Sequence, residues 1–244
     1  MTAGALLDAR GITKRFGGLT AVRDVSFSVA EGEMVGVIGP NGAGKTTLFS
    51  LLSGFIQPDA GEIYFEGRPI DGLSPEARCR LGLCRTFQLV KPFGNMTVLE
   101  NVMVGAFARH RTPAAARVEA ERVLELTGTT GIAHVLARKL PVEQRKRLEV
   151  ARALATSPRL LLLDEVFAGL NPTETKAMVE FLRRLHAQRL TLLIIEHVMA
   201  VIMTVSQRIL VLHEGAKIAE GPPAAIARNP RVVEAYLGEE YLLA

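Results

Sequence analysis

The chain has 244 residues, of which 48% are hydrophobic, a balance that suits one large domain with a buried core and excludes global disorder. Its 29 basic and 25 acidic residues leave a formal net charge of +4, too small an excess to indicate nucleic-acid or membrane binding by itself. Cys79 and Cys84 match no common metal or redox spacing, so we expect buried free thiols. Apolar runs are far shorter than a bilayer span, so any membrane role should come through a partner.

The first third of the chain alternates short strand patterns with turns. Residues 26–29 alternate apolar and polar side chains, residues 61–65 repeat the pattern, and Glu66-Gly67 follows as a turn. This predicts antiparallel β-structure at the start of the chain.

A glycine-rich loop interrupts this region directly after the apolar run 34–38. Residues 39–47 fit the pattern G-x-x-x-x-G-K-[ST], in which glycines turn backbone N–H groups inward onto an anion and the next helix presents its positive end. An ordinary glycine-rich turn between a strand and a helix is the alternative. We predict a nucleoside triphosphate site, with Lys45 on the outer phosphates and the Thr46 hydroxyl on Mg²⁺. The expected nucleotide-binding residues are Asn41, Gly42, Ala43, Gly44, Lys45, Thr46 and Thr47.

Helix signals dominate the next block, roughly residues 74–155. Thr97 and Glu100 form a capping box, Thr112-Pro113 is a helix start, and Gly128 is a helix end. We expect this block to be a helical insertion.

Strands and helices alternate again from residue 160 onward, as in a largely parallel sheet. The apolar strand Leu160–Leu163 ends in Asp164 and Glu165. At the carboxyl edge of such a sheet, Asp164 can orient Mg²⁺ while Glu165 polarises an attacking water molecule. A core strand that meets a polar loop would show the same residue pattern, but the presence of the phosphate loop favours the catalytic interpretation.

These motifs, in this order, resemble those of the ATP-binding cassette (ABC) transporter ATPases, and the resemblance covers nearly the whole chain. It implies an α/β fold: a P-loop NTPase core with a mostly parallel sheet, an antiparallel β subdomain and a helical subdomain insertion. The single domain 1–244 would divide into a β-rich core, residues 1–73 and 156–244, and the insertion 74–155.

The resemblance also assigns roles to three isolated residues. Phe16 stands where the family stacks an aromatic ring on the adenine base. Gln88 stands where a glutamine contacts the metal and the attacking water, and His197 where a histidine contacts the γ-phosphate. Without the family, Phe16 would fit a core residue as well as a stacking ring, His197 would be predicted to be structural, and Gln88 would be a surface amide.

The main departure from the family lies in the signature, Leu-Ser-Gly-Gly-Gln, which caps the ATP held by the opposing subunit. Here the segment reads Leu140, Pro141, Val142, Glu143 and Gln144. Pro141 removes a backbone N–H, and the Glu143 carboxylate would oppose a γ-phosphate unless it turned away. The second subunit could be the same chain or a different one, and pairing with a different ATPase subunit would suit this asymmetry. If that partner carries a regular signature, hydrolysis should occur mainly at the site with Lys45 and Glu165. The basic run 145–147 is interpreted as a solvated helix face rather than a nucleic-acid patch.

Within the family, residues 16–22, 168–172, 195–197 and 229–238 resemble the ATPases of branched-chain amino acid importers. The resemblance implies ATP and Mg²⁺ as cofactors. The implied partners are transmembrane permease subunits, a second ABC ATPase subunit and, indirectly, a periplasmic solute-binding protein, with no nucleic acid. The expected location is peripheral, on the cytoplasmic face of the inner membrane. Leucine-type amino acids, amides and urea all stay open as cargo.

Two other functions are retained as alternatives. One is a cassette protein without a membrane partner that acts as a nucleic-acid-linked switch, disfavoured by the single cassette and the lack of heptad repeats. The other is a subunit that binds ATP as a structural or regulatory partner without hydrolysing it, suggested by the altered signature.

Overall fold

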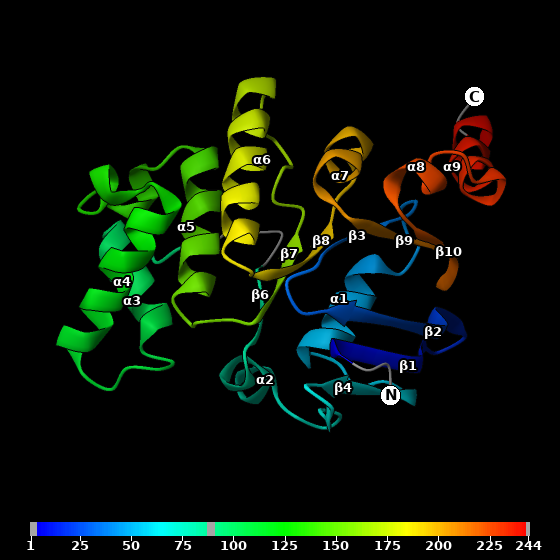
Figure 1. Cartoon of the computed structure of the whole chain (residues 1–244), viewed down its shortest axis with the longest axis horizontal. Helices are drawn as coiled ribbons and strands as arrows, with labels where there is room; N and C mark the ends of the chain where they lie inside the picture. Colours follow the sequence, from blue (N-terminus) through cyan, green and yellow to red (C-terminus); the bar gives the residue numbers. More distant parts are fainter. Residues whose placement is uncertain (1–3, 87–90, 243–244) are drawn as a thin grey trace.

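The computed structural model describes residues 4–86 and 91–242 and contains two β-sheets with helices between and beside them (Figure 1). The expected fold class is confirmed: the structure has a mostly parallel sheet, an antiparallel sheet and a group of helices.

The antiparallel sheet is built by the first third of the chain, as the alternating patterns predict. Its strand order is β2-β1-β4-β5. The strands are β1 (Ala5–Phe16), β2 (Leu19–Ala30), β4 (Ala60–Phe65) and β5 (Arg68–Pro69). The expected turn at Glu66-Gly67 joins the last two, and both of its residues have positive φ angles.

The second sheet has the order β10-β9-β3-β8-β7-β6. Its strands are β3 (Met34–Ile38), β6 (Leu83–Arg85), β7 (Leu160–Asp164), β8 (Thr191–Ile195), β9 (Arg208–His213) and β10 (Ala216–Gly221). Strands β9, β3, β8, β7 and β6 run parallel, and β10 pairs antiparallel to β9. The carboxyl ends of β3, β7 and β8 therefore meet at one edge of the sheet.

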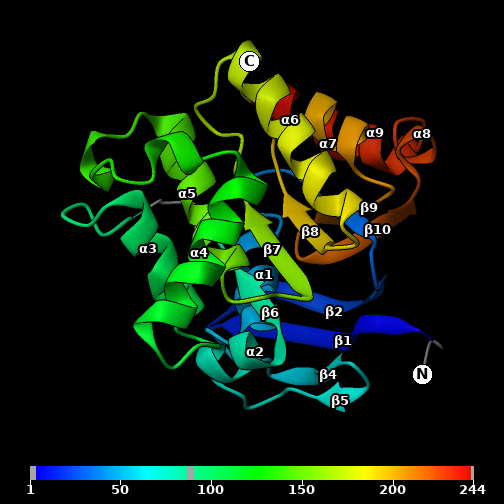
Figure 2. The same cartoon turned by 60° about the vertical axis from the view of Figure 1, so that its left-hand side comes forward.

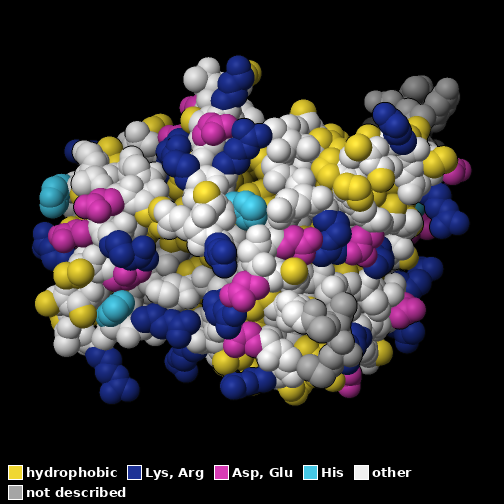
Figure 3. Space-filling view, viewed as in Figure 1, with side chains coloured by type: hydrophobic (Ala, Val, Ile, Leu, Met, Phe, Trp, Pro, Cys, Tyr) yellow, Lys and Arg dark blue, Asp and Glu magenta, His cyan; other side chains and the backbone are white. Residues whose placement is uncertain are grey.

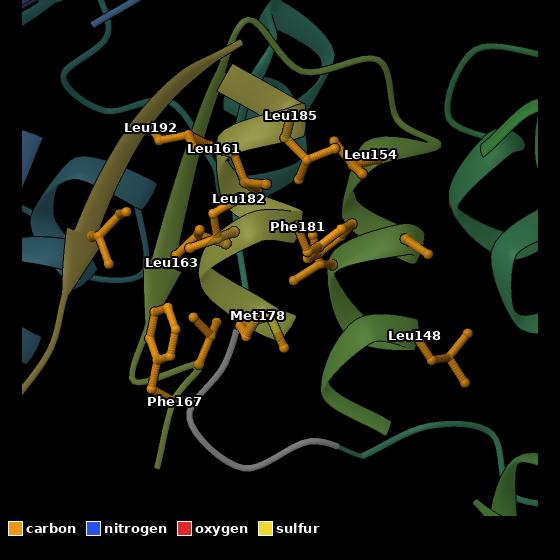
Figure 4. Packing of buried hydrophobic residues seen from close by; sticks show 14 of the residues in the cluster. Leu148, Leu154, Leu161, Leu163, Phe167, Met178, Phe181, Leu182, Leu185 and Leu192 are labelled. Atoms are coloured by element: carbon orange, nitrogen blue, oxygen red, sulfur yellow. The ribbon is translucent and has the colours of Figure 1, made fainter. Parts of the chain in front are cut away.

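Both faces of this sheet are buried, which explains why β7 and β8 read as unbroken apolar runs. Side chains of β7 alternate between two cores. Leu160 and Leu162 face the core around α1 (Lys45–Ser53), a helix that lies between the two sheets. Leu161 and Leu163 face the opposite core. There, α6 (Pro172–Ala187) packs Phe181, among other side chains, against β7 and α5 (Figure 4).

The segment between β4 and β7 carries most of the predicted helices. They are α2 (Pro75–Leu81), α3 (Val98–Ala106), α4 (Pro113–Thr127) and α5 (Val142–Leu154), with short 3-10 turns at Thr130–Ile132 and Ala137–Lys139. Helices α3, α4 and α5 lie together to one side of the sheets in Figure 1 and come forward in the turned view of Figure 2. The Thr97–Glu100 capping box and the Thr112 cap are present as predicted. The segment also holds β6, a strand that the sequence did not reveal and that extends the parallel sheet through β7.

The chain ends in α7 (Met199–Val205), α8 (Pro223–Ile226) and α9 (Pro230–Leu242). No helix within residues 4–86 and 91–242 combines the length and apolarity needed to cross a bilayer. Cys79 and Cys84 are free thiols, as expected, although Cys79 is only partly buried.

Candidate functional site

The loop between β3 and α1 has a backbone that only glycine accommodates at two positions. Gly44 has φ 98°, and a Cβ there would lie 2.3 Å from the Ala21 carbonyl oxygen. A Cβ on Gly39 would lie 2.1 Å from the Leu212 carbonyl oxygen. Because such contacts are impossible for other residues, the glycines let the loop run against neighbouring backbone and enter the helix directly. The loop therefore has the backbone expected of an anion-binding turn at a helix N-terminus.

Lys45, the first residue of α1, turns its side chain back into this loop. Its Nζ donates to the carbonyl oxygens of Gly39 at 2.5 Å and Pro40 at 2.7 Å. The ammonium is almost fully buried, so it is a fixed positive charge inside the loop. An anion in the loop would meet this charge and the positive end of α1 together.

A pocket of ≈ 760 Å³ opens over the loop and unites most of the predicted site. All seven loop residues, 41–47, line it together with Phe16, Glu165 and His197. Phe16 is 49% exposed, and Lys14 Nζ lies 5.6 Å from the centroid of its ring. An exposed ring at the pocket rim is available to stack on a flat aromatic group.

Glu165 and His197 follow neighbouring strands, β7 and β8, and their side chains meet. His197 Nε2 donates to Glu165 Oε1 at 2.6 Å. Glu165 has the left-handed φ of 50°, rare for a residue with a side chain. Such a conformation persists only when its surroundings hold it, and here the backbone N–H of Glu165 donates to the Ile195 carbonyl of β8 at 3.0 Å. The pair thus presents a carboxylate and an imidazole beside the phosphate loop, suited to orienting a water molecule.

Asp164, the last residue of β7, is 2% exposed and lines an adjoining pocket of ≈ 620 Å³ that also contains Thr46. Its Oδ2 accepts from Arg85 at 2.7 Å. Its Oδ1 is buried and has no hydrogen-bond partner among the described residues. A buried carboxylate oxygen in this state, in one pocket with a hydroxyl, fits a hard divalent cation such as Mg²⁺. Arg85 was not singled out from the sequence.

Two further charged residues behind Glu165 were also missed. Glu196 is 2% exposed, and its Oε1 accepts from the Phe167 backbone N–H at 2.8 Å. Burial raises its pKa to about 7. Lys146 donates to the Glu165 carbonyl oxygen at 2.9 Å and is 7% exposed. The expectation that residues 145–147 form a solvated face is therefore wrong for Lys146, because α5 packs this side chain against the loop after β7. A sequence signal existed for Glu196, an acid after an apolar strand, as at Asp164.

The altered signature forms the start of α5, away from the pocket of its own chain. Leu140 is buried, Pro141 is the N-cap residue, and Val142 is exposed. The Glu143 carboxylate turns back along the helix and forms an ion pair with Arg147. Its charge is thus partly neutralised within α5 instead of projecting from the helix end.

Gln88 lies outside the described residues, so its predicted contacts with metal and water stay predictions.

On the face seen in Figure 3, basic and acidic side chains are interspersed rather than gathered in one basic area.

Comparisons with known proteins identify the family to which the chain belongs. A family model described as ABC transporter matches residues 22–168, and one described as branched-chain amino acid ATP-binding cassette transporter matches residues 216–241. The chain is 44% identical to the high-affinity branched-chain amino acid transport ATP-binding protein BraF of Pseudomonas aeruginosa, over 96% of this chain and 98% of that protein. It is 41% identical to the protein of the same description, LivG, of Escherichia coli, with the same coverages.

Among solved structures, the ADP conformation of MJ1267, an ATP-binding cassette of an ABC transporter, superposes with a TM-score of 0.87. The two chains are 32% identical over 96% of this chain and 99% of that one. The likeness therefore extends over both sheets and the helical segment that lies between β4 and β7 in the sequence.

Proposed function

Because this chain belongs to the ABC transporter family and is one of its ATP-hydrolysing cassettes, we propose that it powers an importer of branched-chain amino acids. Two features support this cargo class: the 41–44% identity to BraF and LivG, and the match of residues 216–241 to the branched-chain family model. The observation that carries the ATPase assignment is the single pocket shared by the phosphate loop, Glu165 and His197.

In the proposed mechanism, the triphosphate lies along the loop, with Phe16 against the adenine and Lys45 against the outer phosphates. The backbone N–H groups of residues 41–47 and the positive end of α1 stabilise the charge that develops during transfer. The Glu165 carboxylate accepts a hydrogen bond from the attacking water, and His197 holds that carboxylate in place.

Mg²⁺ is part of this proposal. Thr46 and Asp164 would hold it, since both line the pocket in which Asp164 Oδ1 is buried. Bound there, it would neutralise phosphate charge and orient the reacting groups. Gln88 is proposed as a further contact to metal and water.

The complete site needs a second cassette, because residues 140–144 lie away from the pocket of their own chain. We propose that two cassettes close around ATP, each capping the other's nucleotide with its signature, and that closure moves permease subunits in the membrane. The chain would then be peripheral on the cytoplasmic face, with residues 74–155 as the inserted helical unit. A periplasmic binding protein would deliver the solute.

The signature of this chain lacks the serine hydroxyl and, at Pro141, a backbone N–H. If the partner carries a regular signature, the site capped by the partner therefore differs from the site capped by this chain. Glu165→Gln should then reduce ATP turnover more than the matching change in the partner. Equal losses would contradict this asymmetry. Nothing in residues 4–86 and 91–242 favours the alternative of a cassette that does not hydrolyse ATP, and the Glu143–Arg147 ion pair removes one reason for it.

The cargo assignment is tested by reconstituting the complete transporter in vesicles and measuring uptake of labelled leucine. We expect ATP-dependent uptake that unlabelled isoleucine and valine reduce and urea does not. A complex that hydrolyses ATP in response to another solute, but does not accumulate leucine, would contradict the cargo and leave the ATPase function standing.

A further inference from the structure

One buried contact joins helix α5 to the backbone of Glu165. The Lys146 side chain crosses from α5 to the loop after β7 and donates its Nζ to the Glu165 carbonyl oxygen at 2.9 Å. A buried ammonium is costly unless its protons are used in hydrogen bonds or ion pairs, so this contact is a specific one rather than incidental packing. It lies outside the reaction described above, because no step of that mechanism uses Lys146.

Glu165 is held at three points. Its N–H donates to the Ile195 carbonyl of β8, and its carboxylate accepts from His197. Its carbonyl accepts from Lys146 of α5 and, within the loop, from the Ala168 N–H at 3.3 Å. With φ at 50°, the residue sits in a conformation that neighbouring groups must maintain. Loss of the Lys146 contact would remove the link between the Glu165 carbonyl and α5, so the loop that carries the carboxylate could shift relative to that helix.

Glu196 completes the support from the opposite side. Its buried carboxylate accepts from the Phe167 N–H at 2.8 Å, two residues after Glu165. It also faces the charges of Lys146 and Glu165. The loop after β7 is thus fastened to α5 through Lys146 and to the segment after β8 through Glu196.

Helix α5 is the same helix that begins with the signature residues. Lys146 lies two residues after Gln144, about half a turn further along the helix. A shift of this helix end would therefore reach the Glu165 carbonyl through the Lys146 hydrogen bond.

We propose that Lys146 is a positioning residue that holds Glu165 in its hydrolytic orientation and couples it to the signature end of α5. This rests on the proposed function, in which that helix end contacts the nucleotide of the partner cassette. The occupancy of one ATP site would then control the geometry of the catalytic carboxylate in the other.

The test compares Lys146→Met, Glu196→Gln and the double variant in the assembled transporter. Methionine keeps an unbranched side chain of similar length but cannot donate to the carbonyl. Glutamine keeps an acceptor for the Phe167 N–H without the charge. Lys176→Met, an exposed position on α6, is the matched control. ATP affinity, kcat, KM, the Hill coefficient for ATP and the melting temperature are measured for each.

For Lys146→Met we expect kcat to fall by about tenfold or more, the usual scale for a lost hydrogen bond to a charged group. ATP affinity should stay within about twofold, because the phosphate loop is untouched. The Hill coefficient should fall toward one. Glu196→Gln and Lys176→Met should keep the wild-type kcat, and the double variant should lose as much as Lys146→Met.

Three results would overturn the proposal. One is a wild-type kcat in Lys146→Met, and another is a kcat restored in the double variant, which would mean that an unpaired Glu196 charge caused the loss. The third is a parallel loss of ATP affinity and kcat. If Lys146→Met does not fold, the double variant is used instead, because it lacks the uncompensated Glu196 carboxylate. The proposal then requires that its kcat falls while its ATP affinity is kept. A wild-type complex without ATP turnover would instead overturn the proposed function.

Discussion

Glu196→Gln should change how the free energy of unfolding depends on pH. The carboxyl group is buried, accepts from the Phe167 N–H and faces the charges of Lys146 and Glu165. Burial raises its pKa from an ordinary 4.5 to about 7. A folded state with the higher pKa binds the proton more tightly than the unfolded state. The resulting stabilisation is fully present below pH 4.5 and is lost as the pH rises through 7.

The size of the effect follows from the two pKa values. The difference between 4.5 and about 7 corresponds to about 3 kcal/mol, of which most is lost between pH 5 and pH 8. Glutamine does not titrate and still offers an oxygen to the Phe167 N–H. The free energy of unfolding of the variant, relative to wild type, should therefore rise by about 2 kcal/mol between pH 5 and pH 8.

Urea unfolding of the full chain at pH 5, 6, 7 and 8 provides the measurement. Glu125→Gln, at an exposed position on α4, is the matched control and should show no such trend. A difference between Glu196→Gln and wild type that stays constant across this range would refute the account of a buried, protonatable Glu196.

Three other substitutions test separate parts of the site. Arg85→Met leaves the buried Asp164 carboxylate without its ion-pair partner and should lower the free energy of unfolding by about 3–5 kcal/mol in urea titrations; a loss below about 1 kcal/mol would contradict this. Gly44→Ala places a Cβ against the Ala21 carbonyl and should weaken ATP binding, measured by calorimetry, by about tenfold or more; unchanged affinity would argue against the loop geometry. Glu143→Gln should alter ATP turnover in the complex by less than about twofold, because the carboxylate already pairs with Arg147. A large increase in ATP turnover would instead indicate that the Glu143 carboxylate lies against a phosphate in the complex.

Local chemistry explains what the sequence predicted well. The caps at Thr97 and Thr112 were predictable because a cap depends on residues within one helical turn. The role of His197 came from the family resemblance, and the sheet explains why this residue meets Glu165. Both follow apolar strands, and neighbouring parallel strands end at the same sheet edge.

Long-range contacts explain what the sequence did not reveal. Strand β6 has three residues, too few to show a period, and it forms only by pairing with β7 much later in the chain. The Arg85–Asp164 ion pair depends on that pairing. Lys146 lies in a run of basic residues that is typical of a solvated face, and its burial depends on the packing of α5 against the loop after β7.

ATP-driven solute uptake by the transporter carrying Glu165→Gln tests the central claim most directly. The substitution keeps the size of the side chain and its ability to accept from His197, but removes the carboxylate that polarises water. We predict that ATP still binds with wild-type affinity while turnover falls by about 100-fold or more and uptake stops. Uptake and turnover at wild-type rates would contradict the assignment of Glu165, and with it the account of how this cassette drives transport.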